Sequence, residues 1–137
     1  MLDVYYKQIR ALLEMAVPVW QAGLTRNESY QIERVQRTAL HSILGEGYKG
    51  YENALEELKC EKLSNRRVEL CEKFAKKAVK HNQFKNWFCE KEENLSNINT
   101  RSQHSRSKYL EVLTRTERYK KSPIPYLTHI LNYLAEK

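Results

Sequence analysis

The segment from residue 25 to residue 44 constrains the fold most, because it carries the signals of a complete amphipathic α-helix. It opens with "TRNE", a capping box in which Thr25 can accept the backbone N–H of Glu28 while Glu28 reaches back to Thr25. Gly45 follows, at the position where a helix commonly ends in left-handed geometry. Between these ends, apolar residues recur at helical spacing in one stripe: Ile32, Val35, Ala39, Leu40, Ile43 and Leu44. The sequence therefore predicts a helix over 25–44 that buries one face.

Four further segments have the same periodicity, and together they predict an all-α fold. The expected helices cover 2–17, 51–58, 62–81 and 124–134. Pro18 ends or kinks the first of them, because proline donates no backbone hydrogen bond and pushes Val17 out of the helical region. Trp20 then lies at the elbow of a helical hairpin. We expect it to plug the core there, and the alternative is a stacking platform for a nucleic-acid base.

The composition along the chain predicts three parts. Residues 1–88 form a small helical bundle, which the aromatic cluster "FKNWF" with Trp87 completes by docking onto it. Residues 89–108 form an irregular linker, because they are rich in Asn, Ser, Glu and Arg and have almost no apolar periodicity. Residues 109–137 form a C-terminal segment with the short helix, and we expect this segment to dock on the bundle.

The charge of the chain favours a polyanionic partner. It has 24 Lys and Arg against 17 Asp and Glu, which gives a formal net charge of +7 and a pI near 9.3. One basic row follows a flank of the 62–81 helix: Lys62, Arg66, Lys73, Lys77 and Lys80. A second group lies opposite the apolar stripe of the 25–44 helix: Arg34, Arg37 and His41. Such rows either follow a phosphate backbone or form a solvated helix face.

Two other parts of the sequence bear on the basic residues. Residues 101–121 carry seven basic residues against two acidic ones, with Tyr109 and Tyr119 interleaved, which suits either base stacking or a loop pinned to the core. Arg67 differs from all the others, since its helical angle sets it among the apolar residues of its helix. A buried guanidinium needs an acidic or carbonyl partner, and the nearest candidates on the preceding helix are Glu56 and Glu57. We therefore interpret Arg67 as a structural latch.

Catalytic and metal chemistry have little support in the sequence. Cys60, Cys71 and Cys89 are an odd number at wide spacing, which argues against a disulfide framework, and no C-x2-C or H-x3-H pair suggests zinc. Asp3 is the single aspartate, and the glutamates are scattered over helix faces. We expect no metal, no cofactor, no small-molecule substrate and no independent enzyme. The sequence contains no apolar run long enough to span a membrane and no signal region, so we expect an intracellular protein.

The order of six sequence blocks resembles one known family. The blocks are "YYKQIRALLEMAVPVWQAGLT", "IERVQRTALHSILG", "YENALEELKCEKLSNRR", "LCEKFAKKA", "FKNWF" and "RTERYKKSPIPYLTHILN". They are similar to the region after the palm in reverse transcriptases of non-LTR retrotransposons, especially the jockey-like group, over nearly the whole chain. Two positions depart from the family pattern. Met15 replaces a tyrosine, and Cys89 follows Trp87 and Phe88 where the family often has proline.

This resemblance implies a thumb, a helical subdomain that grips the template–primer duplex beside the active site of an RNA-directed DNA polymerase. The expected partners are an RNA–DNA or DNA duplex and the palm and fingers of the parent polymerase, in the nucleus or cytoplasm. The chain has no Asp-Asp pair to hold the catalytic metal ions, so it should not polymerise alone.

The alternative to a thumb is a vestigial or protein-interaction helical domain that binds no nucleic acid. Exposed apolar residues on the first helix would favour this alternative. A continuous positive surface would favour the thumb, and it would join Arg34, Arg37, Lys62, Arg66 and Lys73.

Overall fold

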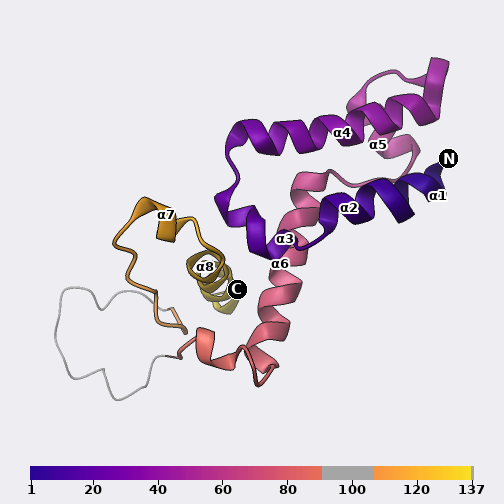
Figure 1. Cartoon of the computed structure of the whole chain (residues 1–137). Helices are drawn as coiled ribbons and strands as arrows, with labels where there is room; N and C mark the ends of the chain where they lie inside the picture. Colours follow the sequence, from indigo (N-terminus) through magenta and orange to yellow (C-terminus); the bar gives the residue numbers. More distant parts are fainter. Residues whose placement is uncertain (91–106, 137) are drawn as a thin grey trace, which may run out of the picture. The chain divides into compact units, whose positions relative to one another are not determined.

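The computed structural model describes residues 1–90 and 107–136, and in these parts of the chain it is all-α, as predicted (Figure 1). The main helices are α4 (Arg26–Leu44), α5 (Tyr51–Glu57), α6 (Leu63–Lys80) and α8 (Pro123–Ala135). The described residues contain no strand and a single isolated antiparallel bridge, between Glu90 and Tyr109. Most of the predicted linker at 89–108 lies outside the described residues.

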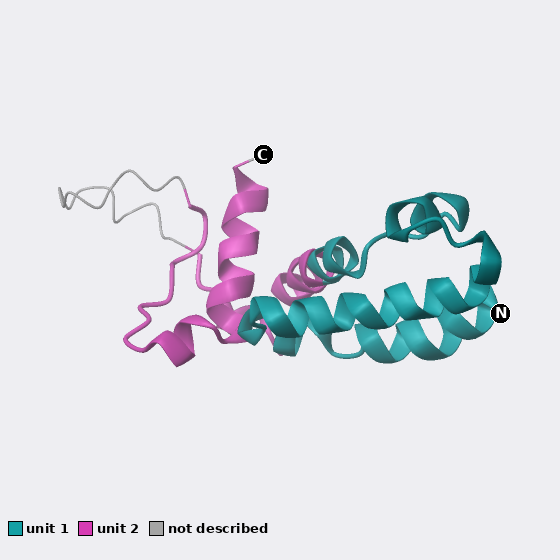
Figure 2. Cartoon of the chain, turned by 90° about the horizontal axis from the view of Figure 1, so that it is seen from above, with its two compact units in different colours: residues 1–70 teal, residues 71–137 magenta. Residues whose placement is uncertain are grey.

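The chain divides into two compact units, Met1–Leu70 and Cys71–Lys137, with the division inside α6 (Figure 2). The predicted boundaries at 88 and 108, and the docking of residues 109–137 on the bundle, remain predictions. Each unit has its own set of buried apolar side chains.

The first helical run ends earlier than the sequence predicts. It consists of α1 (Leu2–Val4), the π-helical turn η1 (Tyr5–Arg10) and α2 (Ala11–Glu14). Met15 is extended and Ala16 is left-handed, with φ 53° and ψ 26°, so the chain turns before the proline. The predicted helix over 2–17 is therefore wrong at its C-terminal end.

The proline itself starts a new helix rather than ending the old one. Pro18 lies in the first turn of α3 (Val17–Trp20), where a missing N–H costs nothing because first-turn amides have no partner within the helix. Val17 is helical and fully buried, contrary to the expected extended geometry. Trp20 is only half-buried, and its Nε1 donates a hydrogen bond to the Met15 carbonyl at 2.8 Å. Val17, rather than Trp20, is the buried core residue at this elbow. Trp20 stabilises the turn through its hydrogen bond to Met15.

The capping box at the start of α4 has the predicted geometry. The Glu28 amide donates to Thr25 Oγ1 at 3.2 Å, and the Thr25 amide donates to Glu28 Oε2 at 2.8 Å. The hydrogen bonds from Thr25 lower the pKa of Glu28. These hydrogen bonds stabilise the charged carboxylate in the folded state. Their contribution to the free energy of unfolding is therefore present at neutral pH, and it is lost as the pH falls through the lowered pKa. Helix α4 ends at Leu44, where Gly45 has a φ of +54°.

Removing the cap should weaken the first unit modestly. We expect Thr25→Ala to lower the free energy of unfolding by about 1 kcal/mol, because it removes the acceptor for an otherwise unpaired first-turn amide. Thr25→Ser keeps that acceptor and should stay close to the wild type. Urea denaturation of the three proteins measures the difference, and equal losses for alanine and serine would contradict this role of the cap.

Polar side chains of α4 also cap the start of α6. Gln36 is fully buried, and its Oε1 accepts the Leu63 amide at 3.1 Å while its Nε2 donates to the Glu61 carbonyl at 2.9 Å. Glu33 Oε2 accepts the Ser64 amide at 3.2 Å. The first amides of a helix have no partner within it, so these two side chains supply what α6 lacks. Gln36 was not among the residues predicted to have a structural role.

A tyrosine of α5 completes this network. The Tyr51 hydroxyl lies 2.6 Å from Glu33 Oε1 and 2.9 Å from Gln36 Oε1, so it can donate to either. Burial and the Glu33 carboxylate raise the pKa of Tyr51, which keeps the phenol protonated and able to donate. Around this point lies the apolar core of the first unit, formed by Tyr5, Leu40, Ala54, Leu55 and Cys60.

The second unit combines the C-terminal half of α6 with η4 (Lys85–Trp87), α7 (Glu117–Lys120) and α8. In the aromatic cluster, the core residue is Phe88, whereas Trp87 is 44% exposed and meets Phe84 edge-on at 4.8 Å. Buried Asn132 of α8 holds the extended chain at Tyr109. It accepts the Tyr109 amide at 2.8 Å and donates to the Tyr109 carbonyl at 3.1 Å.

Candidate nucleic-acid interface

The net positive charge of the protein arises entirely from the second unit. Residues 1–70 contain ten basic and ten acidic residues, and residues 71–137 contain fourteen basic and seven acidic ones. The first unit is therefore neutral and the second carries the whole formal charge of +7. A polyanion is attracted to local excess charge, which makes the second unit the stronger candidate for such a partner.

In the first unit, carboxylates neutralise two of the predicted binding residues. Arg66 lies between Glu14 and Glu69, with N–O distances of 3.2 and 2.8 Å, and Lys62 pairs with Glu52 at 2.8 Å. Partial burial would lower the pKa of Arg66, but the two carboxylates outweigh it and raise that pKa above its usual value. A phosphate would have to compete with these carboxylates for the same cations.

The arginines and the histidine of α4 point into different surroundings. Arg37 lies over the ring of Tyr51, 5.1 Å from its centroid, and lines a hollow of about 280 Å³ that it shares with Lys62 but also with Glu33 and Glu52. His41 is exposed and meets the Tyr48 ring edge-on at 4.8 Å.

Arg34 lies elsewhere, at a separate apolar groove between the first helical run and α4. Within the first unit, the structure therefore brings Arg37 and Lys62 together but does not join them to Arg34 in one hollow. Lys73, the fifth member of the expected positive surface, belongs to the second unit.

The second unit presents a continuous lysine face on α6. Lys73, Lys76, Lys77 and Lys80 are exposed and follow the three- and four-residue steps that keep side chains on one side of a helix. The opposite side is buried through Cys71, Ala75 and Ala78. The face extends over about 10 Å along the helix axis. This length is similar to that of three nucleotides along a duplex axis, at a rise of about 3.4 Å each.

Within the part of the chain that the structure describes, three lysines of this face have no carboxylate partner. Lys76, Lys77 and Lys80 form no ion pair with any residue in the described ranges 1–90 and 107–136. Lys76 was not among the predicted binding residues, although its position three residues after Lys73 places it on the same side of the helix. Lys85 follows this face and is exposed as well.

The basic residues near the C-terminus divide into a paired and an exposed group. Lys108 pairs with Glu90 at 3.3 Å, and this bond raises the pKa of Lys108. The exposed group comprises Arg115, Arg118, Lys120 and Lys121. Since these four lie in and around the short helix α7, they form a second basic surface within the same unit.

Arg67 is buried, as predicted, and two of its partners are side chains of the first unit. The side chain is 1% exposed, its Nε donates to Gln21 Oε1 at 3.0 Å and its Nη2 donates to Ser29 Oγ at 2.6 Å. Glu56 and Glu57 are both exposed. Through these two hydrogen bonds the guanidinium joins α6 to the elbow after α3 and to the first turns of α4, which fits a structural latch.

Apolar side chains are exposed on the first helical run and on the turn that follows it. Leu12 is 70% exposed, and Val4, Met15 and Val19 are exposed as well. Monomeric proteins tolerate single exposed apolar residues, but several along one run are typical of a surface that contacts another macromolecule.

No metal-ligand cluster occurs among the residues that the structure describes, since no three His, Cys, Asp or Glu side chains gather there as ligands would. None of the described helices is long and apolar enough to cross a membrane. Comparison of the chain with protein-family models, with curated proteins and with solved structures finds no match.

Proposed function

We propose that the chain is a nucleic-acid-binding helical module that acts as the thumb of a polymerase resembling the non-LTR retrotransposon reverse transcriptases. In this proposal the second unit holds the phosphate backbone of a template–primer duplex through the lysine face of α6. The observation that carries the proposal is the separation of charge, because the whole excess of +7 lies in residues 71–137. The chain contributes no catalysis, and the polymerase activity belongs to a palm with the aspartates that these residues lack.

The lysine face suits backbone binding rather than base reading. Lysine is a compact, strongly hydrated point charge on a flexible stem, whereas base edges are read mainly by the planar groups of Arg, Asn and Gln. Contacts to phosphate oxygens carry no sequence information and release condensed counterions. We therefore expect binding that ignores sequence and weakens steeply with salt. A partner of this kind is met in the nucleus or cytoplasm.

The exposed apolar residues support a second candidate function. Val4 and Leu12 lie along the first helical run of the neutral unit, and Met15 lies in the turn that follows it. These exposed apolar side chains suit contact with protein. In a thumb this surface would face the rest of the polymerase. In the second candidate it is the main functional surface, and the chain is a protein-interaction or vestigial helical domain that binds no nucleic acid.

Two triple variants of equal net charge test the proposal. One replaces Lys76, Lys77 and Lys80 by alanine, and the control replaces three exposed cations of the first unit, Lys7, Arg26 and Lys49. On a B-form DNA duplex, losing three phosphate contacts should reduce the slope of log affinity against log salt by about 2.7. The control should keep the wild-type slope. An RNA–DNA hybrid with a recessed end is measured in parallel, in filter binding at several salt concentrations.

Three results would count against the lysine face. Equal losses in both triple variants would mean that net charge alone attracts the duplex. Loss of binding in a variant of Arg115, Arg118, Lys120 and Lys121, with the lysine-face variant unchanged, would assign the attraction to the second basic surface. Absence of binding by the wild type at low salt would favour the protein-interaction candidate.

A further inference from the structure

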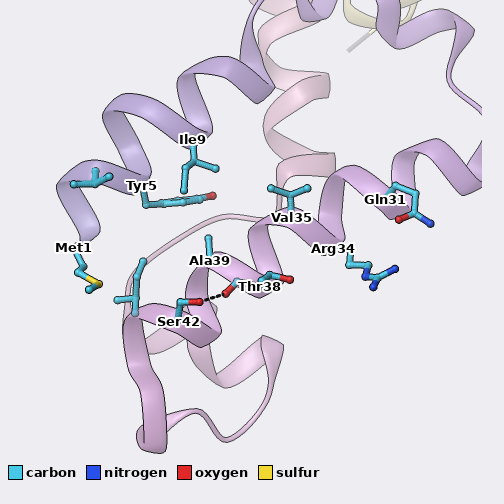
Figure 3. Close-up of a pocket in the computed structure, with 11 residues that line it drawn as sticks. Met1, Tyr5, Ile9, Gln31, Arg34, Val35, Thr38, Ala39 and Ser42 are labelled. Atoms are coloured by element: carbon cyan, nitrogen blue, oxygen red, sulfur yellow. Dashed lines mark hydrogen bonds between the residues drawn. The ribbon is translucent and has the colours of Figure 1, made fainter.

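A long apolar groove lies in the first unit (Figure 3). Its volume is about 610 Å³, and its walls come from two elements, the first helical run and α4. Val4, Tyr5 and Ile9 form one wall, and Val35, Ala39 and Ile43 form the other. Figure 3 shows Tyr5 and Ile9 pointing across the groove toward α4.

The shape of the groove matches a helix. Helix α4 lines it with residues from each turn between Gln31 and Ile43, a length of about 18 Å. Because only two helical walls line it, a small ligand would stay largely exposed, whereas typical small-molecule sites bury most of their ligand. A third helix would cover both walls at once, as the next helix of a bundle does.

Both walls of the groove expose apolar side chains that a third helix could cover. Val4 is 52% exposed and Val35 is 45% exposed, so one apolar residue on each wall remains in water. Covering them with apolar side chains removes this surface from water at about 25 cal/mol per Å². A partner need not supply an acceptor for the Ser42 hydroxyl on the outer edge of α4, because Ser42 Oγ already donates to the Thr38 carbonyl at 3.0 Å.

A charged side chain at the groove indicates the chemistry of the partner. Arg34 lies at the end of the groove opposite Met1 (Figure 3), is exposed, and forms no ion pair with any residue that the structure describes. It is the only Asp, Glu, Lys or Arg side chain that lines the groove in the described residues. A carboxylate at that end of the partner would pair with it bidentately.

We infer that this groove binds an amphipathic helix of a partner protein, with apolar residues at three- and four-residue spacing and an acidic residue that reaches Arg34. The site uses none of the lysines of α6, so the inference is independent of the proposed binding of nucleic acid. Unit one would then recruit a protein while unit two holds a polyanion.

A designed peptide serves as the probe. It has about 14 residues, enough to cover the groove as a helix, with leucines on one face and glutamates along one edge of that face. A second peptide carries lysines in place of the glutamates. Fluorescence anisotropy with the full chain measures both affinities. We expect the acidic peptide to bind the wild type more tightly than the basic one.

Four variants locate the binding. Val35→Asp and, on the opposite wall, Val4→Asp should each weaken the acidic peptide at least tenfold, a change of about 1.4 kcal/mol. Both positions are about half exposed, so the fold should persist, which circular dichroism melting checks. Arg34→Glu should reverse the preference and favour the basic peptide. Arg26→Glu makes the same charge change on α4 outside the groove and should leave the preference unchanged.

Several results would overturn the inference. If Arg34→Glu and Arg26→Glu alter the peptide affinities equally, the attraction is unspecific. If neither peptide binds the wild type, the groove does not hold an acidic helix. If the wild-type chain self-associates in sedimentation and Val35→Asp abolishes this, the groove joins two copies of the chain. Binding of the duplex by Val35→Asp, measured alongside, should equal that of the wild type.

Discussion

Gln36→Leu should lower the free energy of unfolding by about 3 kcal/mol, although it replaces a polar residue by an apolar one at a fully buried position. The substitution leaves the Leu63 amide and the Glu61 carbonyl without the side chain that pairs with them. Each buried polar group that loses its partner costs about 1–3 kcal/mol, and leucine cannot recover this by burial because the site is already filled. Urea denaturation followed by far-UV circular dichroism measures the loss.

A matched glutamine on the same helix provides the control. Gln31 is exposed on α4, so Gln31→Leu should change the free energy of unfolding by less than about 0.5 kcal/mol. Equal losses for the two variants would mean that the effect comes from helix propensity rather than from the capping of α6. A loss confined to Gln36→Leu would support the network of Gln36, Glu33 and Tyr51 as the link between α4, α5 and α6.

Arg67→Ala should also cost about 3 kcal/mol, within the usual range for removing a buried, hydrogen-bonded charge. The guanidinium connects α6 to Gln21 and Ser29, which lie 46 and 38 residues earlier in the sequence. Alanine removes these two hydrogen bonds and also opens a cavity, because Arg67 is among the largest side chains that are fully buried in residues 1–90 and 107–136. Arg67→Lys should recover only part of the loss, since an ammonium lacks the planar fork that reaches two acceptors.

The neighbouring arginine is the control for this prediction. Arg66 forms ion pairs with Glu14 and Glu69, but about a quarter of its side chain is exposed, so water weakens those pairs. Arg66→Ala should therefore cost about 1 kcal/mol or less. Thermal unfolding of both variants compares them directly. Equal melting temperatures would refute the role of Arg67 as a latch.

The sequence by itself determined the local structure where neighbouring residues decide it. The start of α4 follows from Thr25 and Glu28, which are three residues apart and bond to each other's backbone. The burial of Arg67 follows from helical angle alone, because a helix fixes the direction of each side chain relative to the apolar stripe. The lysine face of α6 obeys the same rule, and its one missed member, Lys76, was available from spacing.

The tertiary structure alone decided which distant residues meet. The sequence suggested Glu56 or Glu57 as a partner for Arg67, and it did not indicate that the elbow brings Gln21 to the guanidinium. The local sequence also does not indicate that Glu14 pairs with Arg66, 52 residues later, or that Gln36 caps α6. The elbow itself begins at Met15 and Ala16 rather than at Pro18. The periodicity of apolar residues determines which face a helix buries. Which residue contacts that face depends on the path of the chain between helices, and the spacing of apolar residues within one helix does not encode that path.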